Sequence, residues 1–117
     1  MKRLLSFRYA MNGISAFFRQ GPNAKIQLLA GITAIIAGLI LNISPMEWIA
    51  VIFCCALVLS LEMINTAIEK NCDLISTEYH PLIKTIKDVA AGAVLLSAVA
   101  SLIIGVIIFL PKILSHF

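Results

Sequence analysis

Residues Trp48–Asp73 read WIAVIFCCALVLSLEMINTAIEKNCD, an uncharged run as far as Leu61 followed by a polar end. At about 100° per residue in an α-helix, Glu62, Glu69 and Asp73 fall within an arc of roughly 40°. Asn65 lies beside them, about 60° from Glu62. Ionisable groups at membrane depth are costly and usually face a bundle interior or a water-filled site. A solvated helix end would explain Asp73, but further apolar residues follow Glu62, so we favour a functional site.

The composition of the whole chain is that of an integral membrane protein. Its 117 residues are 61% hydrophobic and 13% charged, and the mean hydropathy is +1.01, which excludes an ordinary soluble core. The length corresponds to a single domain, 1–117. The net charge of +3 is spread along membrane-proximal segments rather than clustered with aromatic residues, which argues against a nucleic-acid partner.

The first helix predicted is amphipathic and spans residues 2–20. Apolar residues recur there at spacings of three and four, which is the periodicity of one helical face. Four cations on the same segment favour a helix that lies at the membrane surface. The alternative is that Tyr9 on this helix helps to cover a nucleotide. Gly21-Pro22-Asn23 should end the helix.

Three transmembrane helices should follow, over residues 26–46, 48–70 and 82–110, because each contains an apolar stretch long enough to cross a bilayer. The fold class predicted is therefore an all-α membrane protein. Residues 42–45 should form a turn between the first two spans. Residues 76–81 should interrupt the chain before the third, with Pro81 in the first turn of the new helix. Pro111 and Lys112 should close the third span.

Loop charges set the orientation of the chain in the inner (plasma) membrane. Five Lys or Arg precede the first span and three lie between the second and third, whereas the first-to-second loop has none and the tail has only Lys112. Because positive residues stay cytoplasmic, the N-terminus should be inside and the C-terminus outside. Five of the six acidic residues then gather at the cytosolic end: Glu62, Glu69, Asp73, Glu78 and Asp88.

These residues suit phosphoryl transfer, which needs a cation on the phosphates, basic groups and a residue that orients or deprotonates the attacking hydroxyl. Carboxylates with carboxamide or water ligands suit Mg²⁺. The deeper Glu62 fits the role of general base, and Glu69 fits the metal. The sequence contains neither a Walker A loop nor a kinase glycine-rich loop, so a kinase here must be of an unrelated type. A transporter is disfavoured because polar groups crowd at one end only.

Three ordered motifs carry a family resemblance that covers essentially the whole chain. They are Glu62-x-x-Asn65-Thr66-Ala67-Ile68-Glu69-x-x-x-Asp73, then Glu78-Tyr79-His80-Pro81-Leu82, then Lys87-Asp88-x-Ala90-Ala91-x-Ala93-Val94. The sequence resembles the small prokaryotic membrane lipid kinases, the diacylglycerol kinase and undecaprenol kinase family. This resemblance implies a homotrimer with active sites shared between subunits. It also implies ATP- and Mg²⁺-dependent phosphorylation of a membrane lipid alcohol.

The resemblance also implies roles for individual residues. Glu62 would be the general base toward the lipid hydroxyl, with Asn65 orienting the site, and Glu69 would bind the metal that bridges the ATP phosphates. The remaining matches are to nucleotide-side residues: Tyr9, Asp73, Glu78, His80, and the phosphate- and ribose-side pair Lys87 and Asp88. For His80, a purely structural role at the start of a helix beside Pro81 is an equal alternative.

Gly21 departs from the family pattern. The family normally has a glutamate there that shares the metal with the residue at position 69, and this chain has no Asp or Glu before Glu47. A histidine that many relatives carry is Gln27 here. Either Glu69, phosphates and water hold the metal, or the chain is a non-catalytic binding or assembly protein. The sequence around His80-Pro81-Leu82 and Lys87-Asp88-Val89-Ala90-Ala91-Gly92 resembles the undecaprenol-type branch of the family, which implies undecaprenol rather than diacylglycerol as the substrate.

Overall fold

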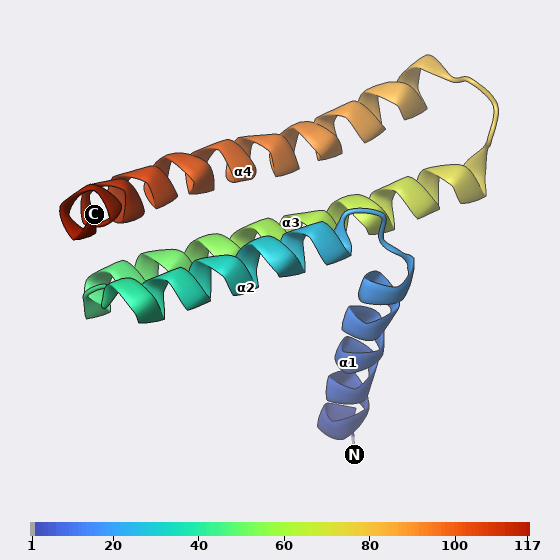
Figure 1. Cartoon of the computed structure of the whole chain (residues 1–117). Helices are drawn as coiled ribbons and strands as arrows, with labels where there is room; N and C mark the ends of the chain where they lie inside the picture. Colours follow the sequence, from blue (N-terminus) through green and yellow to red (C-terminus); the bar gives the residue numbers. More distant parts are fainter. Residues whose placement is uncertain (1) are drawn as a thin grey trace.

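The computed structural model describes residues 2–117. Within that range it consists of four helices joined by short connections, with no strand. The elements are α1 (Lys2–Gln20), α2 (Ala24–Leu41), α3 (Pro45–Ile75) and α4 (Pro81–His116). Helices α2, α3 and α4 run as long rods beside one another, and α3 packs against both of the others (Figure 1). Helix α1 leaves this group at a steep angle. The predicted all-α architecture is confirmed.

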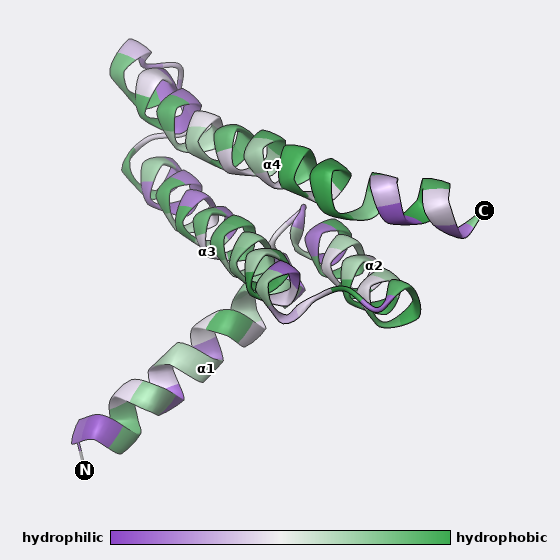
Figure 2. Ribbon diagram, turned by 90° about the vertical axis from the view of Figure 1, so that its left-hand side faces the viewer, coloured by the Kyte–Doolittle hydropathy of each residue, from purple (hydrophilic) through white to green (hydrophobic). Residues whose placement is uncertain are grey.

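Helices α2, α3 and α4 are each long and apolar enough to cross a membrane. Figure 2 shows hydrophobic residues along the middle of these helices and hydrophilic residues toward their ends. Inside a bilayer no water is available to the backbone, so each spanning segment must satisfy its own N–H and C=O groups, which a helix does. The uncharged runs therefore become helices, and the polar residues that interrupt them become connections.

The first span ends earlier than predicted, at Leu41 rather than at residue 46. Asn42 adopts a left-handed conformation with φ 53° and ψ 56°, and its N–H donates to the Gly38 carbonyl. Asn tolerates this conformation better than most residues. Ser44 and Glu47 then form a reciprocal capping box at the start of α3. Residues 45–46 therefore belong to α3, which begins before the predicted residue 48.

Helices α3 and α4 extend beyond residues 70 and 110, where the second and third spans were predicted to end. Helix α3 continues to Ile75, so the acidic residues at its end are helical. Helix α4 begins at Pro81 and passes through Pro111 to His116. A proline removes one backbone hydrogen bond without necessarily ending a helix. Just after it, Lys112 Nζ lies 3.2 Å from Glu47 Oε1, and this ion pair fixes the last turns of α4 against the start of α3.

The buried apolar cluster lies at the end of the bundle that contains this ion pair. Ile43, Val51 and Ile108 form its centre, and Trp48 packs against them. A Cβ added to Gly38 would lie 2.8 Å from the Trp48 ring and 3.0 Å from Ile43 Cδ1. Glycine at this position therefore allows the turn and the aromatic ring to close onto α2. The opposite end of the bundle contains the polar residues Glu62, Asn65 and Glu69.

Replacing Gly38 by alanine should lower the stability of the protein by about 1–3 kcal/mol, because the added methyl group overpacks the contact with Trp48. The measurement is the thermal unfolding midpoint in detergent micelles. Gly105→Ala is the control, since a Cβ there would meet nothing within 4 Å. That variant should unfold at or slightly above the native midpoint. Equal midpoints for the two variants would contradict this account of the Gly38 contact.

Candidate active site

Polar side chains from α3 and from the start of α2 line a cavity of about 310 Å³, and small apolar residues of α4 close it. The α3 residues are Glu62, Asn65 and Glu69, which lie on one face as the helical spacing predicts. Asn23 and Gln27 face them from α2, and the α4 wall is Ala91, Val94, Leu95 and Ala98. The predicted catalytic and metal residues are thus brought into one cavity.

Glu62 and Asn65 are the two deepest polar groups of this cavity, with exposed fractions of 4% and 8%. Asn65 Nδ2 donates to Glu69 Oε1 over 3.1 Å, which sets the orientation of the amide. Its Oδ1 atom is then buried, with no hydrogen-bond partner among residues 2–117. An unsatisfied buried acceptor costs about 1–3 kcal/mol. The cavity therefore has an acceptor ready for a donor group of a ligand.

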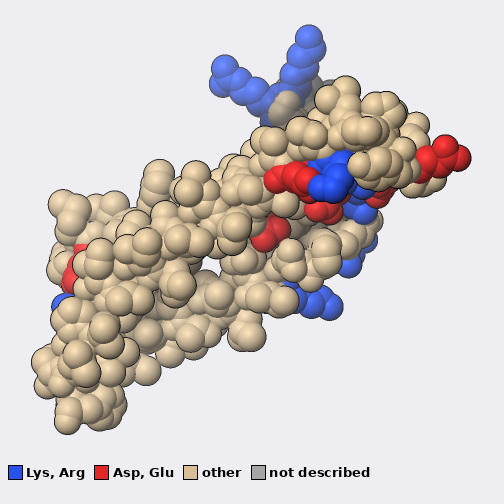
Figure 3. Space-filling view, turned by 90° about the horizontal axis from the view of Figure 1, so that it is seen from above, with Lys and Arg blue, Asp and Glu red and all other residues tan. Residues whose placement is uncertain are grey.

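Beyond the cavity, polar residues of α3 and α4 form ion pairs near the connection between these two helices, which we call the open end of the bundle. Lys87 Nζ lies 2.7 Å from Asp73 Oδ1 and joins α4 to α3, and Lys84 Nζ lies 2.6 Å from Asp88 Oδ2 within α4. Figure 3 shows acidic and basic side chains gathered at this end. Exposed pairs of this kind contribute little to stability. Their charges are instead accessible to a ligand outside the cavity.

Three predicted nucleotide residues lie away from the cavity. Tyr9 is 66% exposed on α1, and Glu78 and His80 lie in the exposed connection between α3 and α4. The Leu82 N–H donates to His80 Nδ1 over 3.2 Å, so His80 caps the start of α4. This contact fits the purely structural role at the start of a helix that was the alternative for His80. Within one chain, these three side chains do not join Glu62 and Glu69.

Comparison with known proteins gives a consistent result. The family of prokaryotic diacylglycerol kinases matches residues 8–109. An undecaprenol kinase from Bacillus subtilis is 43% identical over 107 residues, which are 92% of this chain and 87% of that protein. A diacylglycerol kinase from Synechocystis is 41% identical over 113 residues, which are 96% of this chain and 65% of that protein. A diacylglycerol kinase from Pseudomonas aeruginosa is 34% identical over 94 residues, which are 80% of this chain and 76% of that protein.

The chain belongs to the prokaryotic diacylglycerol kinase family. It is therefore a lipid kinase that uses ATP, and three apolar helices make it an integral membrane protein. At Gly21, where the family resemblance predicts a glutamate, a Cβ would lie 2.7 Å from the Phe17 carbonyl oxygen. The backbone at the junction of α1 and α2 thus fits glycine closely, and any larger residue requires that junction to shift.

Asn23 and Gln27 are cavity residues that sequence reasoning did not assign to the site. Asn23 is the N-cap residue of α2, yet its side chain makes no capping hydrogen bond. Gln27 is one helical turn further on, so both side chains point to the same side of α2. The sequence feature that could have indicated them is the spacing of two carboxamides, four residues apart at the start of an apolar helix. They give this family member a second polar wall opposite Glu62.

Proposed function

We propose that this lipid kinase transfers the γ-phosphate of ATP to the hydroxyl of undecaprenol, or otherwise of diacylglycerol, at the cytosolic surface of the inner membrane. The observation that carries the proposal is the buried Glu62 carboxylate in a polar cavity that it shares with Asn65 and Glu69. The identity with an undecaprenol kinase supports the isoprenoid alcohol as acceptor. Loop charges support a cytosolic N-terminus and an outer C-terminus.

In this proposal Glu62 accepts the proton of the lipid hydroxyl as the oxygen attacks the γ-phosphorus. The bond from that phosphorus to the ADP oxygen breaks, and the lipid phosphate and ADP leave. A carboxylate removed from water suits this step, because fewer solvent hydrogen bonds compete with the substrate proton. Asn65 holds Glu69 in place and orients the site. The positions of both groups on one rigid helix fix their spacing.

Mg²⁺ fits the oxygen ligands of this cavity. No group of three metal-ligating side chains occurs within residues 2–117, but Mg²⁺ keeps several waters and takes one or two carboxylates plus substrate phosphates. Glu69 would hold the ion on the protein side. Mg²⁺ supplies charge neutralisation on the phosphates when bound. Lys87 supplies further positive charge at the cavity mouth, paired with Asp73.

The nucleotide site requires more than one chain in this proposal. Four of the residues assigned to the nucleotide are exposed and do not line the cavity: Tyr9, Glu78, His80 and Asp88. A homotrimer that shares its active sites would bring such residues of one subunit to the cavity of the next. Many large apolar side chains of α2, α3 and α4 are exposed, so these helices have surface available both for lipid and for neighbouring subunits.

The direct test is transfer of labelled γ-phosphate from Mg²⁺-ATP in mixed micelles that contain undecaprenol or diacylglycerol. We expect label in undecaprenol at the higher kcat/KM. Label in diacylglycerol alone would reverse the substrate assignment. Absence of label from both alcohols, with ATP binding intact, would contradict the kinase and support the non-catalytic alternative that Gly21 raises. The family assignment favours the kinase over that alternative.

Replacing Gly21 by glutamate should not raise activity and should lower thermal stability, because the Cβ of any residue there meets the Phe17 carbonyl oxygen at 2.7 Å. Gly21→Ala is the matched control and should show the same loss of stability, about 1–3 kcal/mol, without a new carboxylate. Both variants are measured for unfolding midpoint and for phosphate transfer. A large gain in activity for Gly21→Glu over Gly21→Ala would show that the native site lacks a needed metal ligand.

A further inference from the structure

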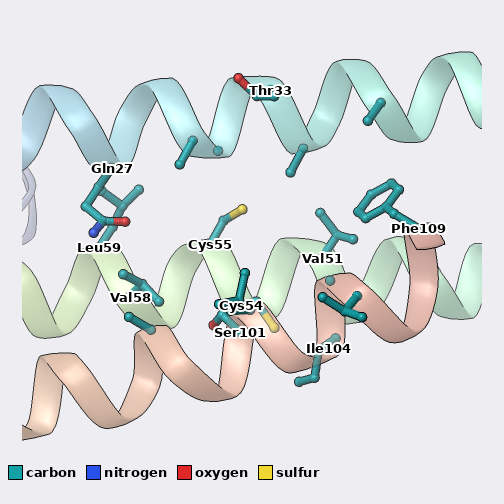
Figure 4. A pocket seen from close by; sticks show the side chains of 18 of the residues that line it. Gln27, Thr33, Val51, Cys54, Cys55, Val58, Leu59, Ser101, Ile104 and Phe109 are labelled. Carbon is teal, nitrogen blue, oxygen red and sulfur yellow. The ribbon is translucent and has the colours of Figure 1, made fainter. Parts of the chain in front are cut away.

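An apolar cleft of about 550 Å³ lies between α2, α3 and α4 and runs along the membrane-spanning part of the bundle (Figure 4). Its walls are mostly aliphatic side chains and small residues, with Phe109 toward one end. Thr33 also lines it, but the Thr33 hydroxyl donates to the Leu29 carbonyl over 2.8 Å and so is already paired. The cleft therefore offers apolar surface of the kind that a hydrocarbon chain contacts.

The cleft and the polar cavity meet, because Gln27 and Ala98 line both of them. Gln27 is half-buried, and its carboxamide lies between α2 and α3 at one end of the cleft. Glu62 lines the polar cavity but not the cleft. A molecule with a long apolar chain in the cleft and a terminal hydroxyl in the polar cavity would thus contact Gln27 at the point where its chain meets its hydroxyl end.

The hydrogen-bonding inventory of the cavity indicates what Gln27 contributes there. A hydroxyl group has one donor and two acceptor positions. Glu62 takes the donor hydrogen in the proposed reaction, so the oxygen needs a donor from the protein as negative charge develops on it. The Asn65 amide nitrogen donates one of its two N–H groups to Glu69, and the Asn23 amide also lines the cavity, but neither of these side chains borders the cleft. The Gln27 amide is a donor that borders both the cavity and the cleft.

We propose that Gln27 positions the acceptor hydroxyl, with its amide N–H donating to the hydroxyl oxygen while the hydrocarbon chain of the lipid alcohol lies in the cleft between α2, α3 and α4. This inference rests on the proposed function and adds a substrate-positioning residue to it. It predicts a preference for an alcohol with a single slender chain, because one chain would fill the cleft while the hydroxyl remains at Glu62.

The test compares Gln27→Leu with Gln27→His and Ser97→Ala in this protein, in micelles that contain a lipid alcohol. Leucine keeps the volume but removes the donor, so kcat/KM for the lipid should fall roughly tenfold or more, with KM for ATP unchanged. Histidine retains an N–H donor and should recover most of that loss. Ser97→Ala is the control, because Ser97 lines neither the cleft nor the polar cavity and its hydroxyl donates to the Val94 carbonyl; it should behave as the native protein.

Gly105→Leu tests the path of the chain separately. Gly105 lines the cleft away from Gln27, and a Cβ there would meet nothing within 4 Å, so leucine is accommodated and projects into the cleft. This variant should lose activity roughly tenfold toward long-chain alcohols and retain native activity toward a short-chain alcohol. Equal effects on both chain lengths, or native kinetics for Gln27→Leu, would overturn the inference while leaving the kinase intact. Native protein that labels no alcohol would instead overturn the proposed function, and this inference with it.

Discussion

Glutamine in place of Glu62 should reduce phosphate transfer to the lipid to about a hundredth of the native rate or less, because a positioned general base contributes roughly 10²- to 10⁴-fold. Glutamine has nearly the same shape and can still fill the buried position, so the variant loses the proton acceptor rather than the packing. Glu62 is 4% exposed, and water therefore cannot easily replace it. The measurement is the initial rate of label transfer from Mg²⁺-ATP under saturating lipid.

Two controls are needed to attribute a lower rate to the chemical step rather than to weaker ATP binding or a disturbed fold. ATP binding by Glu62→Gln, measured at equilibrium, should equal that of the native protein, because the proposed reaction assigns Glu62 to the lipid hydroxyl and not to the nucleotide. Ser97→Ala is a suitable control: Ser97 is also buried, but its hydroxyl donates to the Val94 carbonyl over 2.8 Å and it does not line the cavity. We expect near-native transfer for it. A rate for Glu62→Gln within threefold of native would exclude Glu62 as the base.

Much of the fold follows from the sequence because the bilayer leaves few alternatives. Uncharged runs of sufficient length must form helices there, and a glutamate such as Glu62 inside such a run must face something other than lipid. The cavity with Glu62, Asn65 and Glu69 follows from that reasoning and from helical periodicity alone. The all-α architecture was predicted in the same way and is confirmed. The lipid kinase family was predicted from the resemblance of three sequence motifs and is also confirmed.

The parts that sequence reasoning did not predict depend on contacts between segments. The end of α2 is decided by the left-handed Asn42 and by the Ser44–Glu47 capping box, whereas the uncharged run continues past both. Pro111 was expected to close the third span, and the helix α4 continues past it beside the Glu47–Lys112 ion pair. Asn23 and Gln27 enter the site only because α2 lies against α3. Tyr9 would require a neighbouring subunit, which one sequence does not place.

Glu69→Gln should raise the Mg²⁺ concentration needed for half-maximal activity by at least about tenfold and lower the rate at ordinary Mg²⁺ by a similar or larger factor. Glutamine retains an oxygen that can accept the Asn65 amide, which is bonded to Glu69 Oε1 at 3.1 Å in the native protein. The orientation of Asn65 should therefore survive, and the change is the loss of a negative charge from the metal ligand. The measurement is transfer rate as a function of Mg²⁺ at fixed ATP.

The expected increase in the Mg²⁺ requirement of Glu69→Gln is large because position 21 is a glycine and offers no carboxylate. The chain has no Asp or Glu before Glu47, so no acid from the α1–α2 junction can take over part of the coordination. Glu69 would be the carboxylate that anchors the ion, and its loss should be only partly recovered by high Mg²⁺, since phosphates and water remain as ligands. Asn65→Ala provides the comparison: it frees Glu69 without removing its charge, so it should lower the rate with little change in the Mg²⁺ requirement. If Asn65→Ala and Glu69→Gln shift that requirement equally, the two residues act as one hydrogen-bonded unit, and Glu69 is not the separate metal ligand proposed.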